Sequence, residues 1–170
     1  AAAGADRLSG GGPMQTVHAT CILIGRYGVL IRGAPGAGKT ELAAALVRET
    51  LRDGGFACLV ADDRVALAAE HGRLVARVPA AIAGLMEIRG RGIETVRHEP
   101  AAVVRLVVDL VAPELLERMP EAAETATIVE GIRLTRQPAS GSGRATVAAI
   151  TAGIRAITEA DTDRIEVDFP

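Results

Sequence analysis

The chain has 170 residues, a formal net charge of -2 and a pI near 6.0, and 49% of its residues are hydrophobic. This length and this apolar content predict a single globular domain with its own core. Because aromatic residues make up only 2% and the arginines are spread along the chain, a nucleic-acid surface is disfavoured, which leaves small anions or a protein surface as partners.

The N-terminal residues and the apolar runs indicate where in the cell the protein is expected. Residues 1–13 are small, Gly-rich and aperiodic, so we interpret them as a flexible tail or a cloning remnant ahead of one domain over residues 14–170. No run approaches eighteen apolar residues without a charge, and no signal peptide is recognisable, which favours a cytoplasmic protein without membrane contact. Cys21 and Cys58 lie in apolar runs without a CxxC spacing, and we expect reduced core thiols.

The first part of the chain alternates apolar runs with Gly, Pro and charged residues, as in an α/β or α+β domain. Strands are predicted over residues 17–24 and 27–33. A helix is predicted over about 39–52, where the sequence DGG ends it. The run 56–63 is predicted to be a buried strand that stops at two acids.

The middle of the chain is less regular. Residues 64–78 hold two alternating runs on either side of His71 and Gly72, which predicts a hairpin. From 79 to 92 the chain is dense in Gly and Arg and is expected to be rich in loops. The run 103–111 predicts another strand.

The last part of the chain begins with a Pro-bounded segment, 112–120, that predicts a helical turn or two. Two short strands are expected around Gly131 within 126–137. Residues 143–158 predict the closing helix, and 163–170 a polar tail with marginal strand character.

The sequence GAPGAGKT carries the strongest signal in the chain. It fits G-x-x-x-x-G-K-[ST] between a predicted strand and a predicted helix, the context in which this pattern binds nucleotide phosphates. The predicted phosphate-binding residues are Gly33, Ala34, Pro35, Gly36, Ala37, Gly38, Lys39 and Thr40. Lys39 is the single lysine beside eighteen arginines. A compact ammonium enters a closed phosphate cradle more readily than a planar guanidinium. The competing interpretation is a fortuitous Gly-rich turn.

Phosphoryl transfer also needs acids, and two adjacent ones follow a predicted strand. Asp62 and Asp63 lie about two dozen residues after the loop, and neighbours at a strand end can point to different sides, one to metal and one to the acceptor. Glu41 follows Thr40 and is a candidate for the surroundings of the metal. Asp109 also ends an apolar run and is the rival metal-binding acid. The competing interpretation is a solvated pair of acids at a strand end.

Two further residues carry weaker local signals. His18 is a lone histidine, and most such residues are structural. Glu87 lies in MEIRGRG, where the two arginines either bind phosphate or only turn the chain.

In this order, the segments HAT, GAPGAGKTELA, LVADDRV and LMEIRGRGIETV resemble the HPr kinase/phosphorylase family, specifically its C-terminal catalytic domain. The likeness spans about residues 17–97, and GSGRATVAAITAGI resembles a later step of that family. The resemblance implies a short form without the family's N-terminal domain, with 14–170 as the catalytic domain. It also implies a sheet like that of phosphoenolpyruvate carboxykinase, so we expect an α/β fold with a mixed sheet, a phosphate loop and flanking helices.

What the resemblance implies for function is a two-way enzyme. With ATP and Mg²⁺ it would phosphorylate a serine of HPr, the small carrier of the phosphotransferase system. In reverse, inorganic phosphate would remove that group and release pyrophosphate. Family members are hexameric, so a homo-oligomer is expected, although the chain is expected to end before the helix that contributes to the hexamer and to HPr docking.

The resemblance also assigns roles residue by residue. Asp62 matches the general base for the serine hydroxyl, His18 a histidine that tunes it, and Arg144 an arginine implicated in phosphorolysis, with Lys39 on the phosphates. The metal set it implies is Thr40, Glu41, Asp63 and Glu87. One departure is Pro35, which replaces a small polar residue and stiffens the loop by fixing φ.

Two other interpretations stay open. One is a regulatory sensor that binds ATP and a partner protein without turnover. The other is a small-metabolite kinase or carboxykinase-like enzyme, which should have a compact acceptor pocket with its own Arg or Lys cluster. Substitution of Asp62 by Ala separates the sensor from the enzyme.

Overall fold

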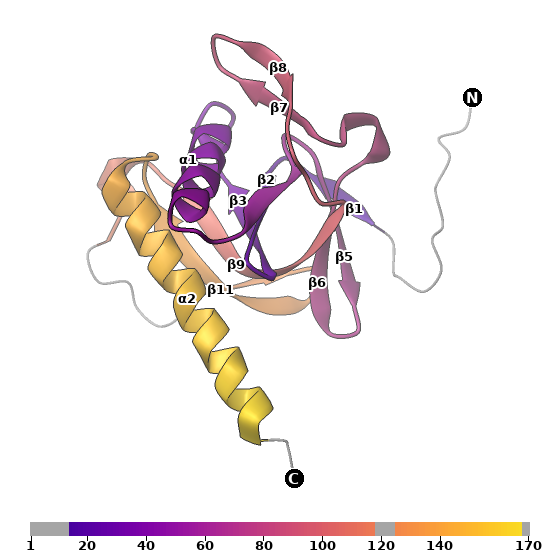
Figure 1. Ribbon diagram of the computed structural model, residues 1–170, viewed down its shortest axis with the longest axis vertical. Coiled ribbons are helices and arrows are strands. Elements are labelled where there is room, and N and C mark those ends of the chain that lie inside the picture. Colours follow the sequence, from indigo (N-terminus) through magenta and orange to yellow (C-terminus); the bar gives the residue numbers. More distant parts are fainter. Residues whose placement is uncertain (1–13, 118–124, 168–170) are drawn as a thin grey trace.

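The computed structural model describes residues 14–117 and 125–167 (Figure 1), so the expected tail over residues 1–13 lies outside them. The strands are β1 Gln15–Val17, β2 Thr20–Ile24, β3 Tyr27–Arg32, β4 Ala57–Ala61, β5 Val65–Glu70, β6 Arg73–Arg77, β7 Leu85–Ile88, β8 Gly92–Thr95, β9 Ala101–Leu110, β10 Ala126–Val129 and β11 Ile132–Ala139. The helices are α1 Lys39–Arg52 and α2 Arg144–Val167, with 3-10 turns over Ala80–Ile82 and Pro113–Leu115. No helix in these ranges is long and apolar enough to span a membrane.

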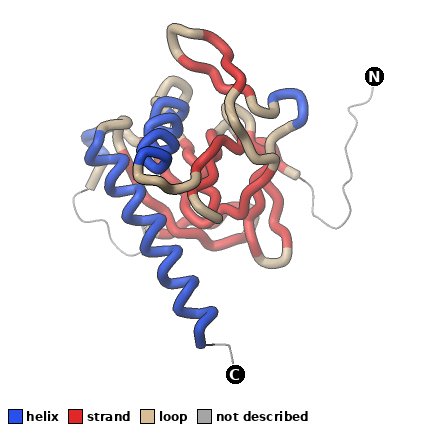
Figure 2. The backbone as a smooth tube through the Cα atoms, in the orientation of Figure 1, coloured by secondary structure: helices blue, strands red, loops and turns tan. Residues whose placement is uncertain are grey.

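One large mixed sheet organises the described residues. Its strands run in the order β1-β5-β6-β9-β3-β2-β4, with β11 also on β9 and β10 on β11. Strand β9 is the pivot, because β3 runs parallel to it along one edge. On the other edge its first residues pair with β6 and its last residues pair with β11. Two strands therefore diverge from one edge, and the sheet curls (Figure 2).

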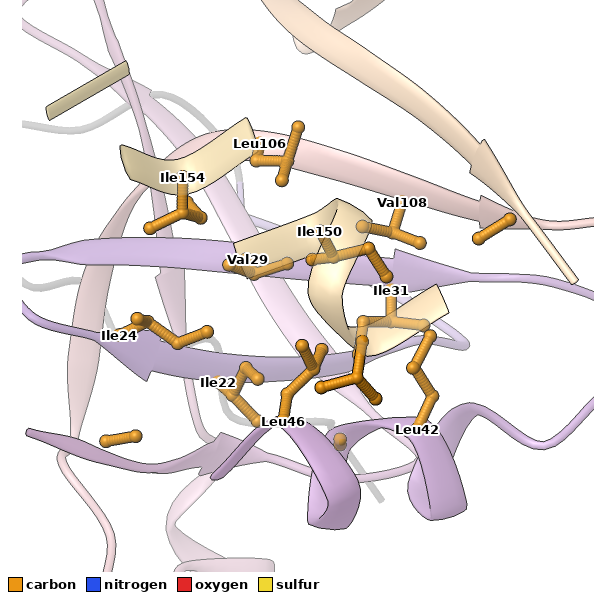
Figure 3. Close-up of a cluster of buried hydrophobic side chains, with 14 of the residues drawn as sticks. Ile22, Ile24, Val29, Ile31, Leu42, Leu46, Leu106, Val108, Ile150 and Ile154 are labelled. Carbon is orange, nitrogen blue, oxygen red and sulfur yellow. The ribbon is translucent and has the colours of Figure 1, made fainter. Parts of the chain in front are cut away.

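Alternation along the central strands divides the core into two layers. Val29 and Ile31 of β3 face the cluster shared with the helices, whereas Leu30 between them faces a second cluster on the opposite side of the sheet. Helices α1 and α2 lie side by side over the first face (Figure 1). Figure 3 shows Leu46 of α1 and Ile150 of α2 pointing into this layer. The expected mixed sheet with flanking helices is confirmed.

The core is almost entirely aliphatic, in keeping with the 2% aromatic content of the chain. Each fully buried Leu or Ile contributes about 1.5–3 kcal/mol relative to an exposed position. Cys21 and Cys58 are free and buried within it. Burial raises the pKa of Cys21 to about 12, so this thiol stays protonated.

Helix α2 is fastened to the sheet by a polar cluster. Tyr27 Oη donates a 2.6 Å hydrogen bond to Asp161 Oδ2, and Arg105 Nη2 donates a 2.8 Å bond to Asp161 Oδ1. Burial and the Asp161 carboxylate together raise the pKa of Tyr27. The polar tail expected from residue 163 is wrong up to Val167, because the helix continues to that residue.

Two other local expectations differ from the structure. The single strand over 17–24 is broken at His18 and Ala19, because Val17 pairs with β5, whereas Thr20 begins the pairing with β3 and Cys21 the pairing with β4. The loop-rich segment contains a hairpin of β7 and β8, in which Gly90 and Gly92 supply positive φ values of 80° and 90°. The predicted hairpin around His71 and Gly72 is confirmed.

Candidate active site

The predicted phosphate loop connects the last residue of β3 to the first residue of α1. Gly36 and Gly38 have φ values of 76° and 93°, a region that glycine adopts without a Cβ penalty. Gly38 precedes the helix, and no side chain caps the first turn of α1. The N–H groups of that turn and the positive end of the helix dipole are therefore available to an anion.

Lys39 is a buried cation with neutral partners. Only 7% of the residue is exposed. Its Nζ donates 3.0 Å hydrogen bonds to the carbonyl oxygens of Gly33 and Ala34, and no carboxylate in the described residues forms an ion pair with it. A buried charge without a counter-charge is costly unless a ligand supplies one.

Asp62 is a buried anion whose partners are also neutral. It follows β4 and is 6% exposed. Oδ1 accepts the two short hydrogen bonds, from Thr20 at 2.8 Å and from Thr40 at 2.9 Å. Oδ2 accepts two longer ones, from Thr40 and from the Glu87 backbone N–H, each at 3.2 Å. Oδ2 is thus the less firmly bound oxygen.

The neighbouring acid points elsewhere. Asp63 has a φ of 66°, and 71% of its side chain is exposed. Its Oδ1 lies 3.1 Å from His18 Nε2. The two acids therefore lie on different sides of the strand end, Asp62 against Thr40 and Asp63 against His18. The structure pairs His18 with Asp63, whereas the resemblance associated it with Asp62.

A cavity of about 270 Å³ brings most of the predicted residues together. Its lining includes His18, Gly36, Gly38, Lys39, Thr40, Glu41, Asp62, Asp63 and Glu87. We call this cavity the cleft. Its remaining lining residues are Thr20, which sequence reasoning did not single out, and Arg89, one of the two arginines of MEIRGRG. In the sequence, Thr20 appears only as the last residue of HAT, and nothing local indicates its hydrogen bond to Asp62, which is 42 residues away.

The predicted metal ligands offer oxygen atoms. Thr40, Glu41, Asp63 and Glu87 all line the cleft, and such oxygens suit Mg²⁺. In the part of the chain that the structure describes, no group of three or more His, Cys, Asp or Glu side chains is arranged to hold a metal ion. Glu41 lies 3.9 Å from Arg89, measured from Oε1 to Nε.

The rival acid, Asp109, is engaged in ion pairs. Arg32 donates to both of its oxygens at 2.8 and 2.9 Å, and Arg136 Nε donates to Oδ2 at 2.6 Å. Burial favours the protonated form of Asp109, but the hydrogen bonds from the two arginines outweigh it and hold its pKa below the usual value. Asp109 is therefore occupied in holding three strands together.

Arg144 lies apart from the cleft. It is the first residue of α2 and lines a cavity of about 550 Å³ between α1 and α2. The two cavities share no lining residue. The structure thus brings the loop, the acids and His18 together but not Arg144.

Comparison with known proteins identifies one family. A family model described as HPr Serine kinase C-terminal domain matches residues 12–131, a range that contains the cleft and stops before Arg144. A solved structure titled Hpr(Ser) kinase/phosphatase from Coxiella burnetii has a TM-score of 0.72 and 26% identity, covering 92% of this chain and 99% of that one.

Curated relatives are longer than this chain. The HPr kinase/phosphorylase of Halalkalibacterium halodurans is 46% identical over 82 residues, which is 48% of this chain and 24% of that protein. The HPr kinase/phosphorylase of Limosilactobacillus reuteri is 35% identical over 127 residues, 68% of this chain and 38% of that protein. The chain thus matches 24% to 38% of the length of these relatives.

Proposed function

Because the chain belongs to the HPr serine kinase C-terminal domain family, we propose that it transfers the γ-phosphoryl group of ATP to a serine of an HPr-type carrier protein. We also propose the reverse reaction, in which inorganic phosphate attacks phosphoserine. The phosphorus–oxygen bond to serine breaks, a bond to the attacking phosphate forms, and pyrophosphate leaves. The reduced thiols Cys21 and Cys58 fit the cytoplasmic location that such chemistry implies.

The observation that carries this proposal is the pair of uncompensated buried charges in the cleft. Among the described residues, Lys39 has only carbonyl partners, and Asp62 has only hydroxyl and N–H partners. A phosphate group supplies the negative charge that Lys39 lacks, and the Gly-rich loop offers N–H groups around it. The residues present therefore fit a nucleotide phosphate.

The same cleft fits Mg²⁺ held jointly by protein and nucleotide. Mg²⁺ commonly binds one or two protein oxygens together with substrate phosphates, where it offsets phosphate charge. Thr40 would provide one lone pair while its O–H still donates to Asp62. Glu41, Asp63 and Glu87 line the same cleft and complete the proposed set.

Asp62 is the proposed base for the serine hydroxyl. Its Oδ1 is fixed by Thr20 and Thr40, so Oδ2, with its two 3.2 Å bonds, is the oxygen that takes the proton. In the reverse direction the same oxygen returns the proton to the leaving serine. His18 would orient Asp63, its partner in the structure, and so act on the metal side of the cleft.

A protein acceptor fits the cleft better than a small anionic metabolite. A metabolite kinase needs cations of its own around the acceptor. Among the described residues, the lysine and arginine side chains that line the cleft are Lys39, which is committed to the loop, and Arg89, whose side chain is 78% exposed at the edge. The open lining suits a serine presented on a surface.

The test incubates the protein with ATP, Mg²⁺ and purified HPr and locates phosphate by mass spectrometry. Phosphoserine should form, and added inorganic phosphate should then release pyrophosphate. Unmodified HPr together with Lys39-dependent ATP binding would reject the enzyme and favour the sensor. Asp62→Ala separates the two further, since it abolishes transfer by an enzyme and leaves a sensor's ATP binding intact.

A further inference from the structure

Another cavity, which we call the apolar cavity, lies where the end of α1, the turn between β2 and β3 and the middle of α2 meet. Its volume is about 500 Å³, within the range of pockets that hold small molecules. The buried side chains of Ile24 and Ile154 line it, together with Phe56, which is 37% exposed. The lining therefore offers an apolar surface to the body of a ligand.

Two glycines keep the apolar cavity open. Gly25 and Gly55 lie in the two turns that border it. At Gly25 no atom lies within 4 Å of the place where a Cβ would be. At Gly55 a Cβ would lie 2.9 Å from Thr50 Cγ2, so no side chain fits there. The turns consequently leave the space to a ligand.

Opposite charges on the lining face the same space without pairing. Asp53 follows the last residue of α1, whereas Arg155 comes from α2. Both also line the neighbouring cavity that contains Arg144, which places them together at one end of the apolar cavity. Neither forms an ion pair within the described ranges. A ligand that carries one positive and one negative group would satisfy both.

The charges on the whole lining balance. Its arginines are Arg26 and Arg155, and its acids are Asp53 and Glu159. A lining without net charge is unsuited to a phosphate group, which carries only negative charge, and suits a zwitterion.

The uncharged polar groups indicate where the positive group of such a ligand would lie. The hydroxyls of Thr151 and Thr158 donate 2.9 Å hydrogen bonds to carbonyl oxygens of α2, so their oxygens keep lone pairs for a ligand. The negative end of the α1 dipole lies beside Asp53. These acceptors suit an ammonium group, and the guanidinium of Arg155 suits a carboxylate.

We propose that the apolar cavity binds an α-amino acid with a large apolar side chain. Asp53 would hold the ammonium group, Arg155 the carboxylate, and Ile24, Phe56 and Ile154 the side chain. The proposal does not rest on the kinase assignment, because the apolar cavity and the cleft share no lining residue.

The test titrates ¹⁵N-labelled protein with L-phenylalanine and follows backbone amide resonances. Gly25 and Gly55 report on the apolar cavity and should shift and saturate, whereas Gly36 and Gly38 report on the cleft and should not move. The analogue 3-phenylpropionate lacks the ammonium group, and 2-phenylethylamine lacks the carboxylate. Each should bind roughly tenfold more weakly or worse, because a hydrogen bond between charged groups is lost. L-Alanine lacks the apolar body and should bind more weakly still.

Single substitutions test which residue holds which group. Asp53→Asn should weaken L-phenylalanine binding by roughly tenfold and should not weaken 3-phenylpropionate, which has no ammonium group to lose. Arg155→Gln should weaken L-phenylalanine similarly and should not weaken 2-phenylethylamine. Both residues are exposed, so the folded structure should tolerate these changes. If a variant does not fold, the analogue series on the wild type still decides the outcome.

Matched controls separate specific binding from net charge. Glu114→Gln and Arg133→Gln remove one charge of each sign from exposed residues that do not line the apolar cavity, and should leave the binding of all ligands as in the wild type. The proposal would be overturned if Gly25 and Gly55 show no saturable shift with L-phenylalanine. Equal affinities for L-phenylalanine and its two analogues would overturn it as well, and so would equal losses in test and control variants.

Discussion

The acids at two strand ends beside the loop have opposite kinds of partner, charged at one end and neutral at the other. At the end of β9, Asp109 is bound by Arg32 and Arg136, so each charge there has an opposite partner. In the cleft after β4, Asp62 is bound by neutral donors and Lys39 by neutral acceptors. Both acids end apolar strands of one sheet.

This difference in partners distinguishes an acid that stabilises the fold from an acid and a lysine that bind a ligand. An acid that is ion-paired with two arginines contributes to stability, and because the arginines neutralise its charge it is a poor ligand or base for a substrate. An acid and a lysine with neutral partners keep their charges for a ligand, at a cost in stability. The following predictions test this division, starting with the largest effect.

The variant Lys39→Gln removes the unmatched cation. ATP-dependent transfer should fall by roughly 100- to 1000-fold, because a donor aimed at the transferred phosphate is lost. The free energy of unfolding should stay near the wild-type value, since no ion pair is broken. Phosphoserine formation and urea denaturation measure the two quantities. A large loss of stability together with normal turnover would mean that Lys39 serves the fold rather than the ligand, which is the opposite of this account.

The variant Asp109→Asn leaves Arg32 and Arg136 without their anion. The three side chains are 17%, 33% and 25% exposed, so we expect a loss of about 2–3 kcal/mol in the free energy of unfolding. Urea denaturation measures it. The same exchange at Asp63, whose side chain is 71% exposed, is the control and should change stability little. Equal effects at the two positions would contradict the account.

The contribution of Asp109 should depend on pH. The arginines hold its pKa in the folded protein below the ordinary value of 3.8, so its stabilisation is complete above that value and is lost as the pH falls through the folded-state pKa. The stability gap between wild type and Asp109→Asn should therefore narrow below pH 3.8. Urea curves across this range measure it, and a gap that stays constant would show that the carboxylate charge is not responsible.

Thr20→Val should give the smallest effect. Thr20 is fully buried, and its hydroxyl donates to Asp62 Oδ1, so its loss should cost about 1 kcal/mol in the barrier to transfer. Valine keeps the side-chain shape, and ATP affinity should be unchanged. Thr16→Val on exposed β1 is the control. A lower ATP affinity at a normal rate would place Thr20 in binding rather than in positioning Asp62.

Local patterns predicted much of the fold and the cleft. The loop, the helix from Lys39 and the acids after β4 follow from short contiguous signals, and the structure places them together. What sequence reasoning missed depends on partners far along the chain. Asp109 and Asp62 both follow apolar runs in the sequence, and what distinguishes Asp109 is its contact with Arg136, which lies 27 residues further along the chain.

Register explains the remaining misses. The break after Val17 arises because the chain changes neighbours between β5 and β3, which no local pattern records. His18 then reaches Asp63, and Arg144 begins a helix and lines a cavity that shares no residue with the cleft. Such placements depend on which strands pair over long sequence distances, and the composition of the chain does not predict that pairing.

The most direct test compares single-turnover phosphoserine formation on HPr by the wild type and by Asp62→Asn at equal ATP occupancy. Asn keeps the shape of the side chain and cannot take the proton, so the rate should fall by about 100- to 10,000-fold. Because the variant removes a buried charge without an ionic partner, its free energy of unfolding should be unchanged or higher. Transfer at the wild-type rate by a folded Asp62→Asn protein would contradict the assignment of chemistry to this acid.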